Sequence, residues 1–186
     1  ADGRTAVVVG TRYVSRVDVT PGQTSTANDT VTGDTILTLV DPAHPDGRWR
    51  VTLENARWAK DVLVLANAMG VVVTTFVPRN GPTDVRILDA TGHESARVPE
   101  SSAETLGIEG SPDGGFVAAE VTFEDNVALP ERGVIVFDLA RGSQWTYGWR
   151  YGSEDEPVSW SLQAGGVLAV KVPGKTRRFD ATGGKL

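Results

Sequence analysis

The side chains best suited to chemistry in this chain are carboxylates that stand next to one another in polar segments. Glu124 and Asp125 form a pair, and Glu154, Asp155 and Glu156 form a run of three. Several oxygens at one point could bind calcium or a cationic partner. Two carboxylates about 5 to 10 Å apart across a pocket are also what a glycosidase needs. Three consecutive acids cannot all point inward, so a solvated loop is the simpler interpretation of the run.

A second group of candidates combines cations with aromatic rings. Arg57, Trp58 and Lys60 place an indole between two positive charges, which suits a carboxylate-bearing ligand or a hot spot of a protein interface. Packing between structural repeats is the competing interpretation of this tryptophan. Further binding candidates occupy similar irregular segments, namely Arg79, Asn80, Arg132 and Tyr151.

Composition removes several kinds of chemistry. The chain has no cysteine, which excludes disulfides, thiolate catalysis and zinc–thiolate sites. Its two histidines, His44 and His93, stand in expected turns, and no nucleophile elbow or phosphate-binding loop is present. The sequence therefore indicates no catalytic residue, no metal site and no cofactor, and it favours a protein without enzymatic activity.

Charge and hydropathy narrow the range of partners. The net charge is −6, and the densest basic point is Arg177-Arg178, so nucleic acid is not an expected partner. The longest apolar stretch, 62–73, is too short to cross a bilayer. Because the chain begins without methionine and lacks cysteine, we expect a location outside the cytoplasm, after removal of a signal or anchor. The excess of arginine over lysine suggests a GC-rich coding genome, and we expect a bacterial source.

The elements that must position these side chains form a repeat. VRILDATG (85–92) and TRRFDATG (176–183) are nearly the same phrase, and two weaker copies occupy 35–49 and 134–145. Each copy has an apolar run, an aspartate, a short turn with glycine and a further strand. The aspartates, spaced 48, 49 and 42 residues apart, are Asp41, Asp89, Asp138 and Asp180. A period of 40 to 50 residues made of short strands is typical of propeller blades.

The repeated phrase has a structural purpose. An aspartate after a strand accepts hydrogen bonds from N–H groups of the following turn, and the later glycine supplies a positive φ. We expect this of Gly92, Gly142 and Gly183, while SPDGG (111–115) predicts a hairpin with a type I turn. Catalysis by Asp89 or Asp180 is the less favoured interpretation.

Short strands fill the rest of each unit. The first unit offers 6–12 and 14–20 ahead of the strand at 35–40. Residues 53–69 could form a helix, but 62–65 are apolar on every face, and the other repeats have a strand there, so a strand is predicted.

The DATG phrases, the SPDGG turn and the glycine-flanked strand pairs resemble β-propeller repeats of the PQQ-like (quinoprotein-like) or WD40-like kind, over roughly residues 5–185. The resemblance implies an all-β fold, a β-propeller of about four repeats of antiparallel four-stranded blades in one domain, 1–186. The repeats are expected at roughly 1–53, 54–99, 100–150 and 151–186. Trp49 and Trp145 follow the turn as in PQQ-like repeats, but the second and fourth units lack this tryptophan, and no residues match a quinone-enzyme calcium site.

The first and last units look shorter than the others, which leaves three arrangements open. The N-terminal strand could complete the last blade, two chains could form one larger ring, or the chain could be a fragment or half of a larger propeller. Unpaired sheet edges tend to find a partner. We therefore expect a fragment or an assembled half of a larger propeller, with a protein partner or a second propeller-forming chain, including a homodimer.

The resemblance also implies where function lies. Propellers bind through the face made by the loops between second and third strands and by the connections between blades. Here these are the loops 20–34, 78–83 and 124–132 and the connections 54–60, 99–104 and 151–157. The sequence thus predicts a noncatalytic binding or scaffold module that recognises a protein or a surface polymer through this face. The alternative is a glycoside-active or quinone-dependent propeller enzyme whose site needs further blades.

Overall fold

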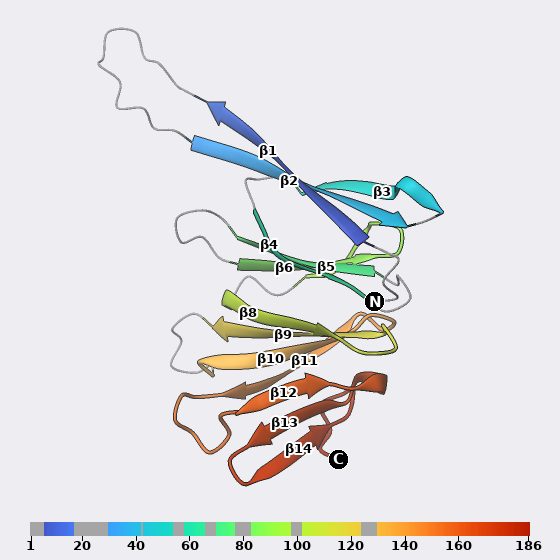
Figure 1. Cartoon of the computed structure of the whole chain (residues 1–186). Helices are drawn as coiled ribbons and strands as arrows, with labels where there is room; N and C mark the ends of the chain where they lie inside the picture. Colours follow the sequence, from blue (N-terminus) through green and yellow to red (C-terminus); the bar gives the residue numbers. More distant parts are fainter. Residues whose placement is uncertain are drawn as a thin grey trace, which may run out of the picture.

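The structure is a computed structural model that describes residues 6–16, 30–41, 43–53, 58–65, 70–76, 83–97, 102–123 and 130–186. These residues form four antiparallel sheets that follow one another along the chain (Figure 1). The first sheet contains β1 (Ala6–Arg16), β2 (Thr30–Asp41) and β3 (His44–Leu53). The second contains β4 (Trp58–Val64), β5 (Gly70–Phe76), β6 (Thr83–Asp89) and β7 (Glu94–Arg97). The third contains β8 (Ser102–Gly110), β9 (Phe116–Phe123), β10 (Arg132–Asp138) and β11 (Ser143–Trp149). The fourth contains β12 (Ser159–Leu162), β13 (Leu168–Val172) and β14 (Lys175–Phe179), with a short 3-10 turn η2 (Ala164–Gly166) between β12 and β13.

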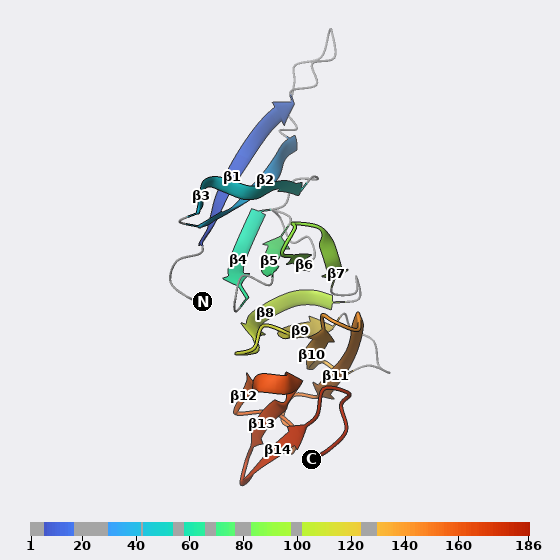
Figure 2. The ribbon, with the colours of Figure 1, turned by 90° about the vertical axis from the view of Figure 1, so that its right-hand side faces the viewer.

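The sheets stack face to face in the order of the sequence. Each is a simple meander in which neighbouring strands pair antiparallel. In both views the first and fourth sheets lie at opposite ends of the stack (Figures 1 and 2). Successive antiparallel meanders packed in this way are propeller blades, so the predicted all-β class is confirmed and the chain has the fold of a partial β-propeller. Four strands per blade were predicted, and among the described residues the second and third sheets have four whereas the first and fourth have three. In the part of the chain that the structure describes, no helix is long and apolar enough to cross a membrane.

The repeated aspartate reveals which strands correspond. It ends β2, β6 and β10 and directly follows β14, so these four are the third strands of their units. The first sheet therefore holds second, third and outer strands, and the fourth sheet holds the first three. The prediction of two strands at 6–12 and 14–20 is wrong: β1 is a single strand that pairs with β2 over its whole length. The N-terminal strand consequently does not complete the last blade. Residues 17–20 lie outside the described residues.

The ambiguous segment 53–69 contains a strand, as predicted. Its middle part, β4, pairs antiparallel with β5 through Val62↔Val73 and Val64↔Val71. The apolar run is on both faces because the second sheet packs between two others, which is the arrangement that favours near-continuous hydrophobic strands.

The core lies between sheets. Along β10, Ile135 and Phe137 pack toward the second sheet, whereas Val134 and Val136 pack toward the fourth. All of β10 after Arg132 is buried. In the fourth sheet, β13 buries only alternate residues, Leu168, Val170 and Val172. The third sheet is thus covered on both faces and the fourth on one.

The repeated turns have the predicted chemistry. Asp89 Oδ1 accepts hydrogen bonds from the N–H and hydroxyl of Thr91 and from the N–H of His93. Asp180 makes the same bonds to Thr182 and to the Gly184 N–H. Gly92 and Gly183 have φ of 86° and 84°. Asp138 accepts from the N–H groups of its own turn, which is one residue longer and places Gly142 at φ 63°. In the SPDGG hairpin the Gly114 N–H donates to the Ser111 carbonyl, which is the hydrogen bond that closes a β-turn.

The aspartates of these turns make the stability of the fold depend on pH. The hydroxyls of Thr91 and Thr182 lower the pKa of Asp89 and Asp180. A carboxyl whose pKa is lower in the folded than in the unfolded state stabilises the fold above the unfolded pKa of about 3.9, and this contribution is lost as the pH falls through the folded pKa. We expect the variant with both Asp89→Asn and Asp180→Asn to show a shallower fall of melting temperature between about pH 5 and 3 than the parent chain. Thermal melts from pH 3 to 7 test this, with the exposed Asp46→Asn as control. An unchanged pH profile in the double variant would contradict it.

Two tryptophans lock neighbouring sheets together. A β-carbon added at Gly92, in the second sheet, would lie 3.0 Å from Trp49 Cδ2 of the first sheet. A β-carbon added at Gly183 would lie 2.9 Å from Trp145 Cε3 of the third sheet. Each indole therefore rests on a glycine of the following repeat, where a side chain would collide with it. The second and fourth repeats, which carry the short DATG turn, contribute the glycine of each contact. The first and third repeats, which precede them, contribute the tryptophan.

Candidate functional site

The structure describes only part of the predicted binding face. Five of the predicted site residues lie outside the described residues, namely Arg57, Arg79, Asn80, Glu124 and Asp125. Several segments predicted as loops belong to strands instead: 30–34 to β2, 58–60 to β4, Thr83 to β6 and 102–104 to β8. Trp58 and Lys60 are accordingly strand residues of β4 and not members of a connection. The strands are longer than the pattern suggested because their backbone pairing continues past the last apolar residue.

A connected cluster of polar and aromatic side chains occupies the junction of the third and fourth sheets. Glu120 of β9 and Arg132 of β10 form an ion pair, with 3.0 Å between Glu120 Oε1 and Arg132 Nη2. The other oxygen of Glu120 accepts a 2.8 Å hydrogen bond from the indole N–H of Trp160 in β12. Both side chains of the ion pair keep only about a fifth of their surface, 20% and 23%. One carboxylate thus ties two strands of one sheet to the first strand of the next.

The exposed member of the cluster is Tyr151. Its ring lies 5.4 Å from the Arg132 guanidinium carbon, in a cation–π contact. Its backbone N–H donates a 2.8 Å hydrogen bond to Glu131 Oε2. Yet 59% of its surface is exposed. We call Glu120, Glu131, Arg132, Tyr151 and Trp160 the Arg132 cluster.

A second network fixes the connection 150–157 beside this cluster. Asp155 pairs with Arg177 of β14 at 2.5 Å, and its carbonyl accepts a hydrogen bond from the Tyr147 hydroxyl. Arg177 also donates to that hydroxyl, at 3.3 Å. The Asp155 carboxylate raises the pKa of Arg177, and burial raises the pKa of Tyr147. The Arg177 side chain therefore stays charged and the Tyr147 hydroxyl stays protonated at neutral pH, and together they hold the connection against two sheets.

The acidic run does not converge on one point. Asp155 is engaged by Arg177, and Glu156 Oε2 accepts a 2.6 Å hydrogen bond from the Gly152 N–H. Glu154 is exposed. Among the residues that the structure describes, no three histidine, cysteine or acidic side chains gather in a group that could hold a metal ion. The run shapes its own loop, which agrees with the simpler interpretation of a solvated segment.

Sequence reasoning brought Arg132 and Tyr151 together on one face but missed the residues that hold them. Glu120 is a lone acid within the apolar strand FVAAEVTF, and a carboxylate at such a position is rarely buried without a partner. That signal could have been used. Glu109 of β8 is similar, since burial raises the pKa of its carboxyl. Trp160 gave no such signal, because nothing in its neighbourhood pointed to Glu120.

The comparisons with known proteins assign this chain to no family. No protein-family model matches the chain, and no curated protein matches its sequence. The PQQ-like or WD40-like assignment therefore stays a prediction. Three solved structures are similar in shape at low identity. Hydrazine synthase of Kuenenia stuttgartiensis has a TM-score of 0.46 and 14% identity over 81% of this chain and 49% of that one. A eukaryotic initiation factor has 0.44 and 9% over 89% and 49%, and TolB from Acinetobacter baumannii has 0.43 and 14% over 98% and 41%. The chain spans about half or less of the length of each.

Proposed function

We propose that this chain is a noncatalytic binding module that recognises a protein or a surface polymer through the loop end of its third and fourth sheets. The observation that carries the proposal is Tyr151, an exposed aromatic ring that stacks on the Arg132 guanidinium and whose backbone N–H is bonded to Glu131. Tyrosine and arginine are among the residues that dominate binding energy at interfaces. A ring that is already fixed loses little conformational entropy when a partner covers it.

The state of the nearby carboxylates supports binding over catalysis. Glu120 uses both oxygens on Arg132 and Trp160, and Asp155 and Glu156 are engaged within the fold. A glycosidase needs one carboxyl to give a proton and another to attack or activate water. Acids committed to ion pairs and backbone N–H groups are suited to holding a surface in shape.

The test is a screen for binders followed by a single substitution. The immobilised chain is screened against a displayed peptide library and a panel of bacterial surface polysaccharides. We expect Tyr151→Ala to weaken the best binder by about 30-fold, because a hot-spot truncation costs about 2 kcal/mol. The control is Arg178→Ser, which changes an exposed residue of β14 outside the Arg132 cluster. Binders that tolerate Tyr151→Ala, or a screen that yields none, would contradict the proposal.

A further inference from the structure

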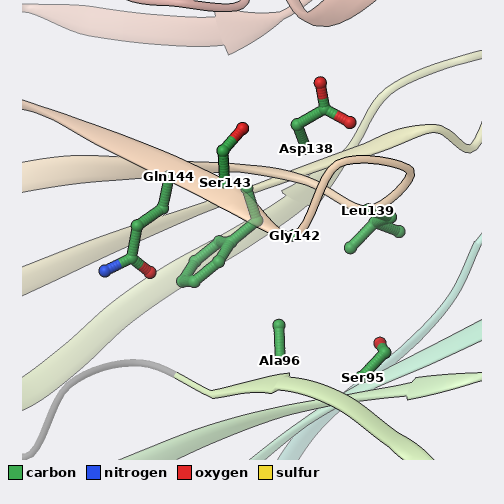
Figure 3. A pocket seen from close by; sticks show the side chains of 8 residues that line it. Ser95, Ala96, Asp138, Leu139, Gly142, Ser143 and Gln144 are labelled. Carbon is green, nitrogen blue, oxygen red and sulfur yellow. The ribbon is translucent and has the colours of Figure 1, made fainter.

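A pocket lies between the second and third sheets, away from the Arg132 cluster. It has a volume of about 170 Å³. Its walls come from β7 and from the turn that joins β10 to β11: Ser95, Ala96, Phe137, Asp138, Leu139, Gly142, Ser143 and Gln144. In Figure 3 the Ala96 methyl points across an open space toward the Gly142 turn, with Leu139 and Gln144 on its two sides.

The position of Ala96 explains why the space exists. The first three sheets can be compared at one position. It is the residue that pairs with the one two places before the repeated aspartate. These pairs are Leu39↔Trp49 in the first sheet, Ile87↔Ala96 in the second and Val136↔Trp145 in the third. Ala96 therefore occupies the position that a tryptophan occupies in both neighbouring sheets.

The wall of the pocket opposite Ala96 corresponds in the same way to the neighbouring junctions. Trp49 rests on Gly92 and Trp145 rests on Gly183, the turn glycines of the next repeats. The corresponding glycine of the third repeat is Gly142, and a β-carbon added there would meet nothing within 4 Å. The junction of the second and third sheets thus retains the glycine that receives an indole but lacks the indole.

We propose that this pocket binds a planar aromatic group of about the size of indole, in the place where the neighbouring junctions hold a tryptophan side chain. The size is suitable, since a protein cavity of about 150 Å³ accepts benzene. The Gln144 amide on one side can accept a hydrogen bond from a ring N–H. The side chains of Trp49 and Trp145 lack such a partner, because their buried indole N–H groups make no hydrogen bond. A ring with an N–H group at its edge therefore finds a hydrogen-bond acceptor in this pocket, which the indole groups of Trp49 and Trp145 do not have.

The experiment titrates 5-fluoroindole with the chain and follows the fluorine resonance by NMR. We expect saturable broadening with the parent chain and at least tenfold weaker binding to Ala96→Trp, whose own indole fills the pocket. Ala96→Trp is also expected to raise the melting temperature by about 2 to 6 °C, as cavity-filling substitutions do. Val158→Trp, which adds the same ring at a site that is 68% exposed, is the matched control and should bind like the parent.

Each outcome decides the proposal. Absence of binding to the parent chain, or equal binding to Ala96→Trp, would overturn it. Should Ala96→Trp fail to fold by circular dichroism, the smaller Ala96→Leu, which partly fills the same space, gives the same test. A parallel titration with N-acetyl-tryptophanamide distinguishes the source of the ring. Binding of both probes supports a tryptophan presented by a polypeptide, and binding of fluoroindole alone supports a free aromatic molecule.

Discussion

Replacing Trp145 by alanine is expected to lower the free energy of unfolding by about 3 kcal/mol, the lower part of the range for large aromatic truncations. Trp145 covers Gly183 of the next sheet and lies 5.8 Å, between ring centroids, from Phe179. The substitution removes both contacts and opens a gap at the junction of the third and fourth sheets. For a chain of this size the loss corresponds to a fall in melting temperature of about 6 to 12 °C.

Urea denaturation and thermal melting measure this effect. The matched control is Gln144→Ala, which changes the preceding, exposed residue of the same strand and should cost less than about 0.5 kcal/mol. Equal losses for the two variants would mean that the indole does not hold the sheets together.

A pair of glycine substitutions tests the same contact from the other side. Gly183 and Gly142 both have positive φ, so Gly183→Ala and Gly142→Ala share a backbone strain of about 1 kcal/mol. Only at Gly183 does the new methyl group meet a tryptophan, at 2.9 Å. Gly183→Ala should therefore be the more damaging of the two. The reverse order would show that the glycines serve their turns alone.

The repeat and its turns could be predicted from the sequence because their chemistry is local. The aspartate, its hydrogen-bonded N–H groups and the glycine with positive φ all lie within five residues of one another, so Asp89 and Gly92 already specify the turn. The resting of Trp49 on Gly92 could not be predicted, since it joins residues of different repeats. The missing tryptophans of the second and fourth units looked like departures from a pattern. In the structure, Ala96 leaves a pocket at one junction, while the DATG turns of both units receive an indole from the preceding sheet.

The sequence also indicates in part which sheets are covered on both faces and which on one. GVIVFD is apolar at every position before its aspartate, and β10 is covered on both faces. LAVKV alternates, and Lys171 of β13 is exposed on the face opposite the third sheet. Arg178 of the neighbouring strand lies on that same outward face and is also exposed. The outward face of the fourth sheet is therefore more polar than the faces that pack between sheets.

Only part of the candidate site could be predicted, for a different reason. Arg132 and Tyr151 were chosen because they stand in irregular segments, but their geometry depends on Glu120, which lies in the middle of a strand. Loop position identifies residues that can reach a partner. It does not identify the charge that keeps them in place.

The last prediction concerns that charge. Glu120→Ala leaves the Arg132 guanidinium largely enclosed without its carboxylate and removes the acceptor of the Trp160 N–H. Breaking a fully buried ion pair costs about 3 to 5 kcal/mol, and because both partners keep about a fifth of their exposure we expect about 2 kcal/mol here. Glu94→Ala is the matched control. Its pair with Arg86 is longer, 3.7 Å, and Glu94 is 39% exposed, so the loss should stay below about 0.5 kcal/mol.

A double-mutant cycle separates the ion pair from the effects of truncation. Glu120→Gln and Arg132→Met are measured singly and together by urea denaturation, and a coupling free energy of about 1 to 2 kcal/mol is expected. Because Arg132 also supports the Tyr151 ring, Glu120→Gln should weaken any binder that depends on Tyr151, although Glu120 itself need not touch it. Zero coupling in the cycle would mean that Arg132 is held by its strand alone. The proposed binding surface would then be built on the backbone of β10, independent of the carboxylate that now joins the third and fourth sheets.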